Sequence, residues 1–189
     1  MKKKDIISPI IIFIFISIII KLSPSFFPVM MPDSFDYIKI ANSNVRTSIY
    51  PGINQLFSFL GIDIIDFQIF FLSCSISLLV FAIFKRTESL TLSAISFFLM
   101  SINYYYTSFS KTILTESLFF AFINLSISMI LLVNEKKKIF FLVLGLLFGL
   151  IITIKPIGIT VALPLILGII IKKKNTKGSS IMGFSIIII

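Results

Sequence analysis

The sequence predicts an all-α protein, a polytopic transmembrane helical bundle with about six spans and a truncated seventh. Of its 189 residues, 57% are hydrophobic and 13% are charged, whereas soluble domains carry roughly 45–50% and about 25%. The mean hydropathy is +1.09, which excludes intrinsic disorder. Long apolar runs alternate with short polar connections, and we treat residues 1–189 as one membrane domain.

The residue types that are missing exclude several kinds of site. The chain has no His and a single Cys, Cys74. It therefore lacks the imidazole of a Ser-His-Asp triad, and it can form neither an internal disulfide nor a zinc site rich in His or Cys. Acid–base chemistry must use carboxylates, lysines, arginines and hydroxyl groups.

Seven apolar runs are predicted to be spans. The first, residues 6–20, resembles the apolar part of a signal peptide, but no small-residue cleavage site follows it, so we predict an uncleaved span. The next five are predicted at residues 64–84, 90–104, 113–133, 139–154 and 157–171. A seventh begins near residue 181 and is cut off at Ile189.

Residues 22–61 form the predicted first extracytoplasmic loop. Prolines and charges interrupt it, but apolar side chains between them argue against disorder. We expect short interfacial helices at residues 34–42 and 53–60, the second closed by Gly61.

The basic residues predict the orientation. With a cytoplasmic N-terminus, the inner connections hold twelve of the 17 basic residues: Lys2, Lys3, Lys4, Lys85, Arg86, Lys136, Lys137, Lys138, Lys172, Lys173, Lys174 and Lys177. Cytoplasmic loops carry such an excess. This predicts a multi-pass protein of the plasma or inner membrane, and it explains the net charge of +9 without a nucleic-acid partner.

Lys21 lies on the predicted outer side, and nine further charged residues map to the same face. They are Asp33, Asp36, Lys39, Arg46, Asp63, Asp66, Lys111, Glu116 and Lys155. Charges at membrane depth are costly, so they tend to be functional and paired. Glu116 and Lys155 lie beside apolar runs and are predicted to pair or to share a cavity with Asp33. The alternative is a structural salt bridge that closes this end of the bundle.

Several of these residues have a second interpretation. Asp33 could be a helix N-cap, and Arg46 could anchor a lipid phosphate. For Asp63 and Asp66 we favour the first turn of a span, where acidic residues suit the helix dipole. Gly145 and Gly149 are spaced for a small-residue helix contact.

Four segments resemble motifs of one family in order, spacing and sidedness. They are residues 32–41 (PDSFDYIKIA), 46–51 (RTSIYP), 114–119 (LTESLF) and 145–156 (GLLFG, then TIKP). The chain resembles the N-terminal part of the GT-C membrane glycosyltransferases that use polyprenyl-phosphate sugars, such as the protein mannosyltransferases and the lipid A aminoarabinose transferases. Ser48 replaces a proline of the family pattern, and Lys155 replaces an arginine.

The resemblance implies transfer of a hexosyl or pentosyl group, with inversion, from a polyprenyl-phosphate sugar to an acceptor on the outer face. It assigns catalytic roles to Asp33, as general base, and to Glu116, which would orient a cation or help ligate one. It implies that Asp36, Tyr37, Arg46, Tyr50, Lys111 and Lys155 bind the substrate, the cationic ones at the phosphate. No metal ligand set is predicted, although Mg²⁺ or Mn²⁺ bound with substrate oxygens is an option.

Other functional classes remain open at the level of the sequence. Members of the resembled family are longer, so we expect a fragment or a chain that a second polypeptide completes. A transporter or lipid-sugar flippase is one alternative, although such proteins place their sites near the midplane. A non-catalytic membrane remnant is the other.

Overall fold

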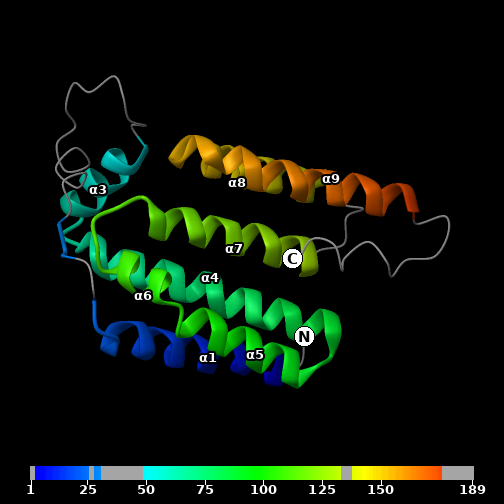
Figure 1. The fold of residues 1–189 in the computed structure, drawn as a ribbon, viewed down its shortest axis with the longest axis horizontal. Coiled ribbons are helices and arrows are strands. Elements are labelled where there is room, and N and C mark those ends of the chain that lie inside the picture. Colours follow the sequence, from blue (N-terminus) through cyan, green and yellow to red (C-terminus); the bar gives the residue numbers. More distant parts are fainter. Residues whose placement is uncertain (1–2, 26–27, 31–48, 133–137, 176–189) are drawn as a thin grey trace.

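The computed structural model describes residues 3–25, 28–30, 49–132 and 138–175. All regular structure in these residues is helical, which confirms the all-α part of the prediction (Figure 1). The elements are α1 (Lys3–Leu22), α3 (Ile49–Phe59), α4 (Ile64–Thr87), α5 (Leu90–Ser101), α6 (Tyr104–Ser110), α7 (Glu116–Leu132), α8 (Lys138–Ile154), the 3-10 turn η1 (Pro156–Gly158) and α9 (Ile159–Asn175).

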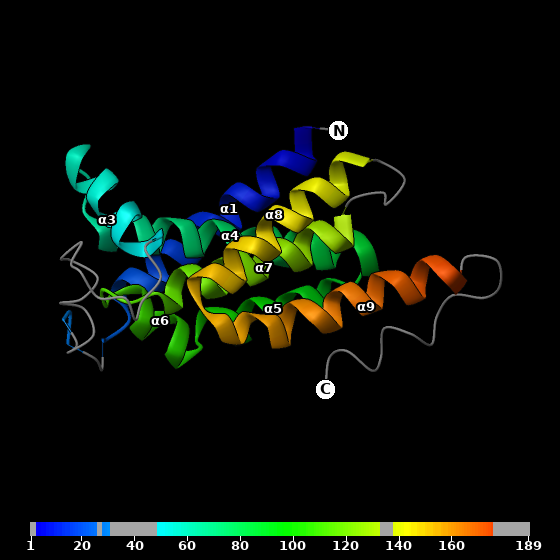
Figure 2. The ribbon, with the colours of Figure 1, turned by 90° about the horizontal axis from the view of Figure 1, so that it is seen from above.

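The long helices lie side by side along the long axis of the molecule (Figures 1 and 2). Helices α1, α5 and α8 run in one direction, and α4, α7 and α9 run in the other. Short connections therefore bring alternate helix ends to the same end of the bundle. This arrangement is what the alternation of apolar runs and polar connections predicts.

Helices α4 and α7 form the centre of the bundle, with α1 and α5 against α4 and α8 against α7. Small polar side chains are buried on both helices, among them Ser73 and Ser75 on α4 and Ser128 on α7. The buried amide of Asn124 on α7 donates to Ser75 Oγ over 3.4 Å. Small residues of this kind let membrane helices approach closely and bond across the contact.

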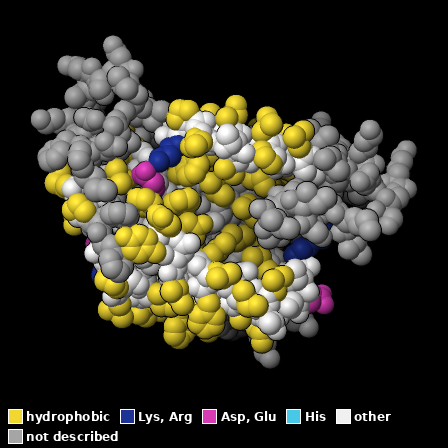
Figure 3. Space-filling view, viewed as in Figure 1, with side chains coloured by type: hydrophobic (Ala, Val, Ile, Leu, Met, Phe, Trp, Pro, Cys, Tyr) yellow, Lys and Arg dark blue, Asp and Glu magenta, His cyan; other side chains and the backbone are white. Residues whose placement is uncertain are grey.

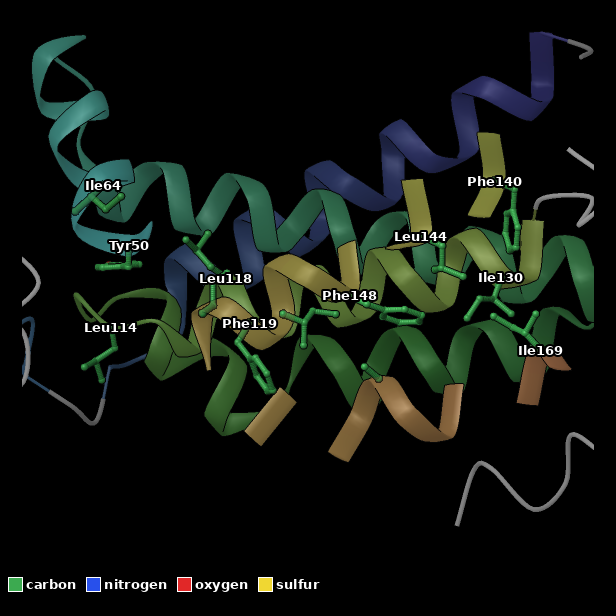
Figure 4. Packing of buried hydrophobic residues seen from close by; sticks show 13 residues of the cluster. Tyr50, Ile64, Leu114, Leu118, Phe119, Ile130, Phe140, Leu144, Phe148 and Ile169 are labelled. Carbon is green, nitrogen blue, oxygen red and sulfur yellow. The ribbon is translucent and has the colours of Figure 1, made fainter. Parts of the chain in front are cut away.

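A hydrophobic cluster joins α3, α4, α7, α8 and α9 (Figure 4). Phe148 and Leu118 are among its buried members. Gly158 packs tightly against Ile151 of α8. A Cβ at this position would lie 2.6 Å from Ile151 Cγ2 and 2.8 Å from Ile151 O, so only glycine fits. The predicted contact at Gly145 and Gly149 is not made within the described residues, since a Cβ at either would meet no atom within 4 Å.

The third predicted span is interrupted. Helix α5 ends at Ser101, and Asn103 then caps a new helix, α6, with its Oδ1 accepting from the backbone N–H groups of Tyr105 and Tyr106 at 3.0 and 3.2 Å. An Asn side chain offers the backbone this alternative to a continuous helix. Residues 107–110, which lie between the predicted spans at 90–104 and 113–133, therefore belong to α6.

The short helix predicted before Gly61 is present as α3, although it begins at Ile49 and not at residue 53; its place at the membrane interface stays a prediction. Gly61 has a φ of +70°. Its N–H donates to Ser58 O, and the N–H of Ile62 donates to Phe57 O. This is the Schellman pattern, for which glycine is favoured.

Among the described residues, α4 is the one helix whose length and composition both suffice to cross a membrane. Five shorter apolar helical stretches accompany it, within α1, α5, α7, α8 and the η1–α9 segment. Large apolar side chains are exposed along these helices, for example Leu99 and Leu142. In the view of Figure 3, hydrophobic side chains cover much of the described surface. Extended exposed apolar surface is typical of membrane contact, while the count of six spans stays a prediction.

Candidate functional site

One end of the bundle collects the described charges that the sequence assigned to the outer face. The last turn of α1, the first turns of α4 and α7, and the last turn of α8 all lie at this end, as do α3 and α6 (Figure 1). Lys21, Asp66, Lys111, Glu116 and Lys155 lie at these termini. The convergence predicted from the sequence is therefore confirmed for these residues.

Glu116 and Lys155 form an ion pair in this region. Lys155 Nζ lies 2.6 Å from Glu116 Oε1, and the two side chains are 29% and 22% exposed. Glu116 is the first residue of α7, where a carboxylate suits the positive end of the helix dipole. Lys155 has an extended backbone between α8 and η1, as expected of a residue before proline. The predicted pairing is confirmed.

The contact between Lys155 Nζ and Glu116 Oε1 leaves other hydrogen-bonding groups of both side chains available. Thr115 Oγ1 donates to the other carboxylate oxygen of Glu116 over 3.5 Å. An ammonium group has three N–H donors, and one accounts for the bond from Lys155 to Glu116. Within the described residues no further bond of Lys155 is found, so two donors face a partly exposed region.

Lys111 is engaged with backbone. Its Nζ donates to Lys21 O over 3.0 Å and also to Ser23 O. These carbonyls lie at the C-terminus of α1, where helices leave carbonyl groups without partners and where cations are favoured. Partial burial lowers the pKa of Lys111. Lys111 therefore fastens the end of α1 to the segment that follows α6.

A second bond strengthens this link. The N–H of Ile113 donates to Val29 O over 3.0 Å. Residues 28–30 are thus held against residues 111–115, the segment that leads directly into Glu116.

Tyr50 is fully buried, and its hydroxyl accepts a hydrogen bond from Gln68 Nε2 over 2.6 Å. Gln68, also fully buried, lies on α4 and reaches the carbonyls of Thr112 at 3.5 Å and Leu114 at 3.4 Å. The sequence analysis did not single out Gln68. The signal that would have found it is an amide within an apolar span, because such a group needs buried partners.

The two aspartates at the start of α4 behave as the favoured interpretation predicted. Asp63 is the N-cap, accepting from the N–H of Ile65 over 2.8 Å. Asp66 lies 3.9 Å from Lys21 Nζ, and these side chains are 67% and 73% exposed. An exposed pair of this kind contributes little to stability.

Four of the predicted site residues, Asp33, Asp36, Tyr37 and Arg46, lie outside the described residues. No group of three potential metal ligands occurs within the described part of the chain. The carboxylate of Glu116 already faces an ammonium group, so the described residues do not by themselves fit a metal centre.

A family model described as dolichyl-phosphate-mannose-protein mannosyltransferase matches residues 49–189, about three quarters of the chain. The chain belongs to this family. Membership confirms the resemblance drawn from the motifs, and it makes the chain a membrane protein of the mannosyltransferase type of glycosyltransferase. The matched residues include both members of the ion pair. No curated protein and no solved structure matches the chain significantly.

Proposed function

We propose that the chain transfers a sugar from a polyprenyl-phosphate carrier to an acceptor on the outer face of the cell membrane, either alone or with a polypeptide that completes the fold. The observation that carries the proposal is the ion pair of Glu116 and Lys155. It lies at one end of an apolar bundle and leaves donors of Lys155 without a described partner.

In this mechanism Lys155 binds the phosphate of the donor. Negative charge grows on that phosphate as the bond to the sugar breaks, and a fixed cation stabilises the charge most in a region with little water. Glu116 holds the ammonium in place through the 2.6 Å ion pair. Arg46 adds a bidentate contact to the same phosphate.

Asp33 acts as the general base that takes the proton of the acceptor hydroxyl. Asp36 and Tyr37 contribute to substrate binding, whereas Tyr50, which the sequence assigned to the same role, is fully buried and supports the site through Gln68. The bond between Ile113 and Val29 supports this assignment. Asp33 follows Val29 by four residues, which span at most about 14 Å of chain, and Ile113 precedes Glu116 by three.

The membrane topology is part of the proposal. The end that holds Glu116 and Lys155 faces outward, and the end that holds Lys85 and Arg86 faces the cytoplasm. The basic clusters of the sequence support this orientation. The alternation of helix directions supports a chain that crosses the membrane about six times.

A charge exchange tests whether the ion pair is functional or only structural. The variants are Lys155→Glu, Glu116→Lys and the double exchange, and the measurements are sugar transfer from a polyprenyl-phosphate mannose and thermal unfolding in lipid nanodiscs. We expect the double exchange to recover the stability lost in the single variants while transfer stays about 10²–10³-fold below wild type, because the cation no longer lies where the phosphate binds.

The exposed pair of Lys21 and Asp66 provides the matched control, since its exchange should alter neither measurement. If the exchange of Glu116 and Lys155 restores transfer together with stability, the pair is a structural salt bridge and the proposal loses its support.

A further inference from the structure

Gln68 occupies a special position in the bundle. It is fully buried on α4, and its side-chain amide contacts two other parts of the chain. Nε2 lies 2.6 Å from the hydroxyl of Tyr50 on α3, and 3.5 and 3.4 Å from the carbonyl oxygens of Thr112 and Leu114. One side chain thereby joins α3, α4 and the connection between α6 and α7.

The connection that Gln68 holds is irregular. The N–H of Leu114 donates to Thr112 O over 2.8 Å, so the backbone makes a tight turn there. Glu116 follows Leu114 by two residues and begins α7. The position of Glu116 relative to Lys155 on the neighbouring α8–η1 corner therefore depends on where this turn is held.

The other end of the amide indicates that Gln68 is not simply a packing residue. Its Oε1 is buried and has no hydrogen-bond partner among the described residues. A buried acceptor without a partner is unfavourable for stability, and such a group in a native fold calls for an explanation. The donor end of the amide provides the explanation, because Gln68 Nε2 contacts the carbonyls of Thr112 and Leu114 and so fixes the turn.

We propose that Gln68 is a positioning residue, which sets Glu116 against Lys155 by holding the 112–114 turn. It acts through the backbone and touches neither charge, and its effect on transfer rests on the function proposed above. Tyr50 assists, since its hydroxyl is the nearest of the three acceptors around Gln68 Nε2.

The test compares Gln68→Met with Asn124→Leu. Asn124 is the matched control because it too is a fully buried amide at the contact of α4 and α7, and its side-chain partners, Ser75 and Tyr106, lie outside the 112–114 turn. The first readout needs no activity. Glu116→Cys and Lys155→Cys are combined in a Cys74→Ser background, and the rate of cross-linking by a short bifunctional thiol reagent is measured.

We expect Gln68→Met to slow this cross-linking several-fold and Asn124→Leu to leave it unchanged. Tyr50→Phe, which removes one hydroxyl and keeps the ring, should give a smaller change in the same direction. Equal rates for Gln68→Met and its parent would overturn the inference, as would an equal loss in the Asn124→Leu variant.

The second readout is kinetic, in the chain with its native Glu116, Lys155 and Cys74. Gln68→Met should lower kcat about 10- to 100-fold while KM for the donor changes little, because misplacement of about 1 Å has effects of this size. A loss of folded protein without the split between kcat and KM would indicate a structural role and would overturn the inference. If wild type transfers no sugar, the proposed function fails, and the cross-linking result still decides whether Gln68 positions the pair.

Discussion

The two carboxylate oxygens of Glu116 accept hydrogen bonds from different partners, Lys155 and Thr115. A partly buried pair of this kind adds little net stability, but removing one member leaves the other charge without compensation. Single substitutions therefore confuse the loss of a function with the loss of a fold, which is why the exchange of both charges is more informative than either alanine variant.

At the same scale, Asp33 is the base in the proposed mechanism and Asp36 is the alternative, since it directly precedes Tyr37. Asp33→Asn should reduce sugar transfer about 10²–10⁴-fold, because a general base contributes that much to the rate. Donor binding should persist. As a helix cap, Asn is about as good as Asp, so a purely structural Asp33 would tolerate the change. Transfer that survives in Asp33→Asn and disappears in Asp36→Asn would assign the base to Asp36.

At the scale of elements, Lys111 links α1 to the segment after α6 through the carbonyls of Lys21 and Ser23. Lys111→Met should lower the free energy of unfolding by about 1 kcal/mol, since charge-assisted bonds to a partly exposed group contribute that order of stability. Thermal unfolding in detergent measures it. Lys21→Met is the control, because it removes an exposed pair and leaves the backbone carbonyl in place. If Lys111→Met left the stability unchanged and weakened donor binding, Lys111 would act in substrate binding, as the sequence predicts, and not as a structural link.

The helix limits show how much of the fold could be predicted from the sequence. The limits of α4, α7 and α8 lie within a few residues of the predicted spans, because apolar runs and charged ends determine them. The break at Asn103 was missed, since a local side-chain bond overrides an apolar pattern that would otherwise read as one helix. The contact of Gly158 with Ile151 was missed too, because it depends on the turn of the chain at Pro156 and not on helical spacing.

The candidate site was predictable to a similar degree. The pairing of Glu116 and Lys155 followed from charge that must be compensated beside apolar runs. Gln68 was not found, because its importance comes from backbone carbonyls 44 and 46 residues away in the chain. Only the packing of α3 and α7 on α4 brings these groups together.

At the scale of the whole molecule, the arrangement of helix ends makes the membrane orientation testable. Ser58 on α3 is exposed at the end that holds Glu116, and Glu88 is exposed after α4 at the opposite end. In a Cys74→Ser background, Ser58→Cys should react with a membrane-impermeant thiol reagent in intact cells or spheroplasts. Glu88→Cys should react only once the membrane is opened, because the basic residues beside it favour the cytoplasm. The reverse pattern would place Glu116 and Lys155 inside, out of reach of an outer-face acceptor. Equal labelling of both positions in sealed membranes would mean that α4 does not cross the bilayer, and the assignment of its two ends to opposite faces would then fail.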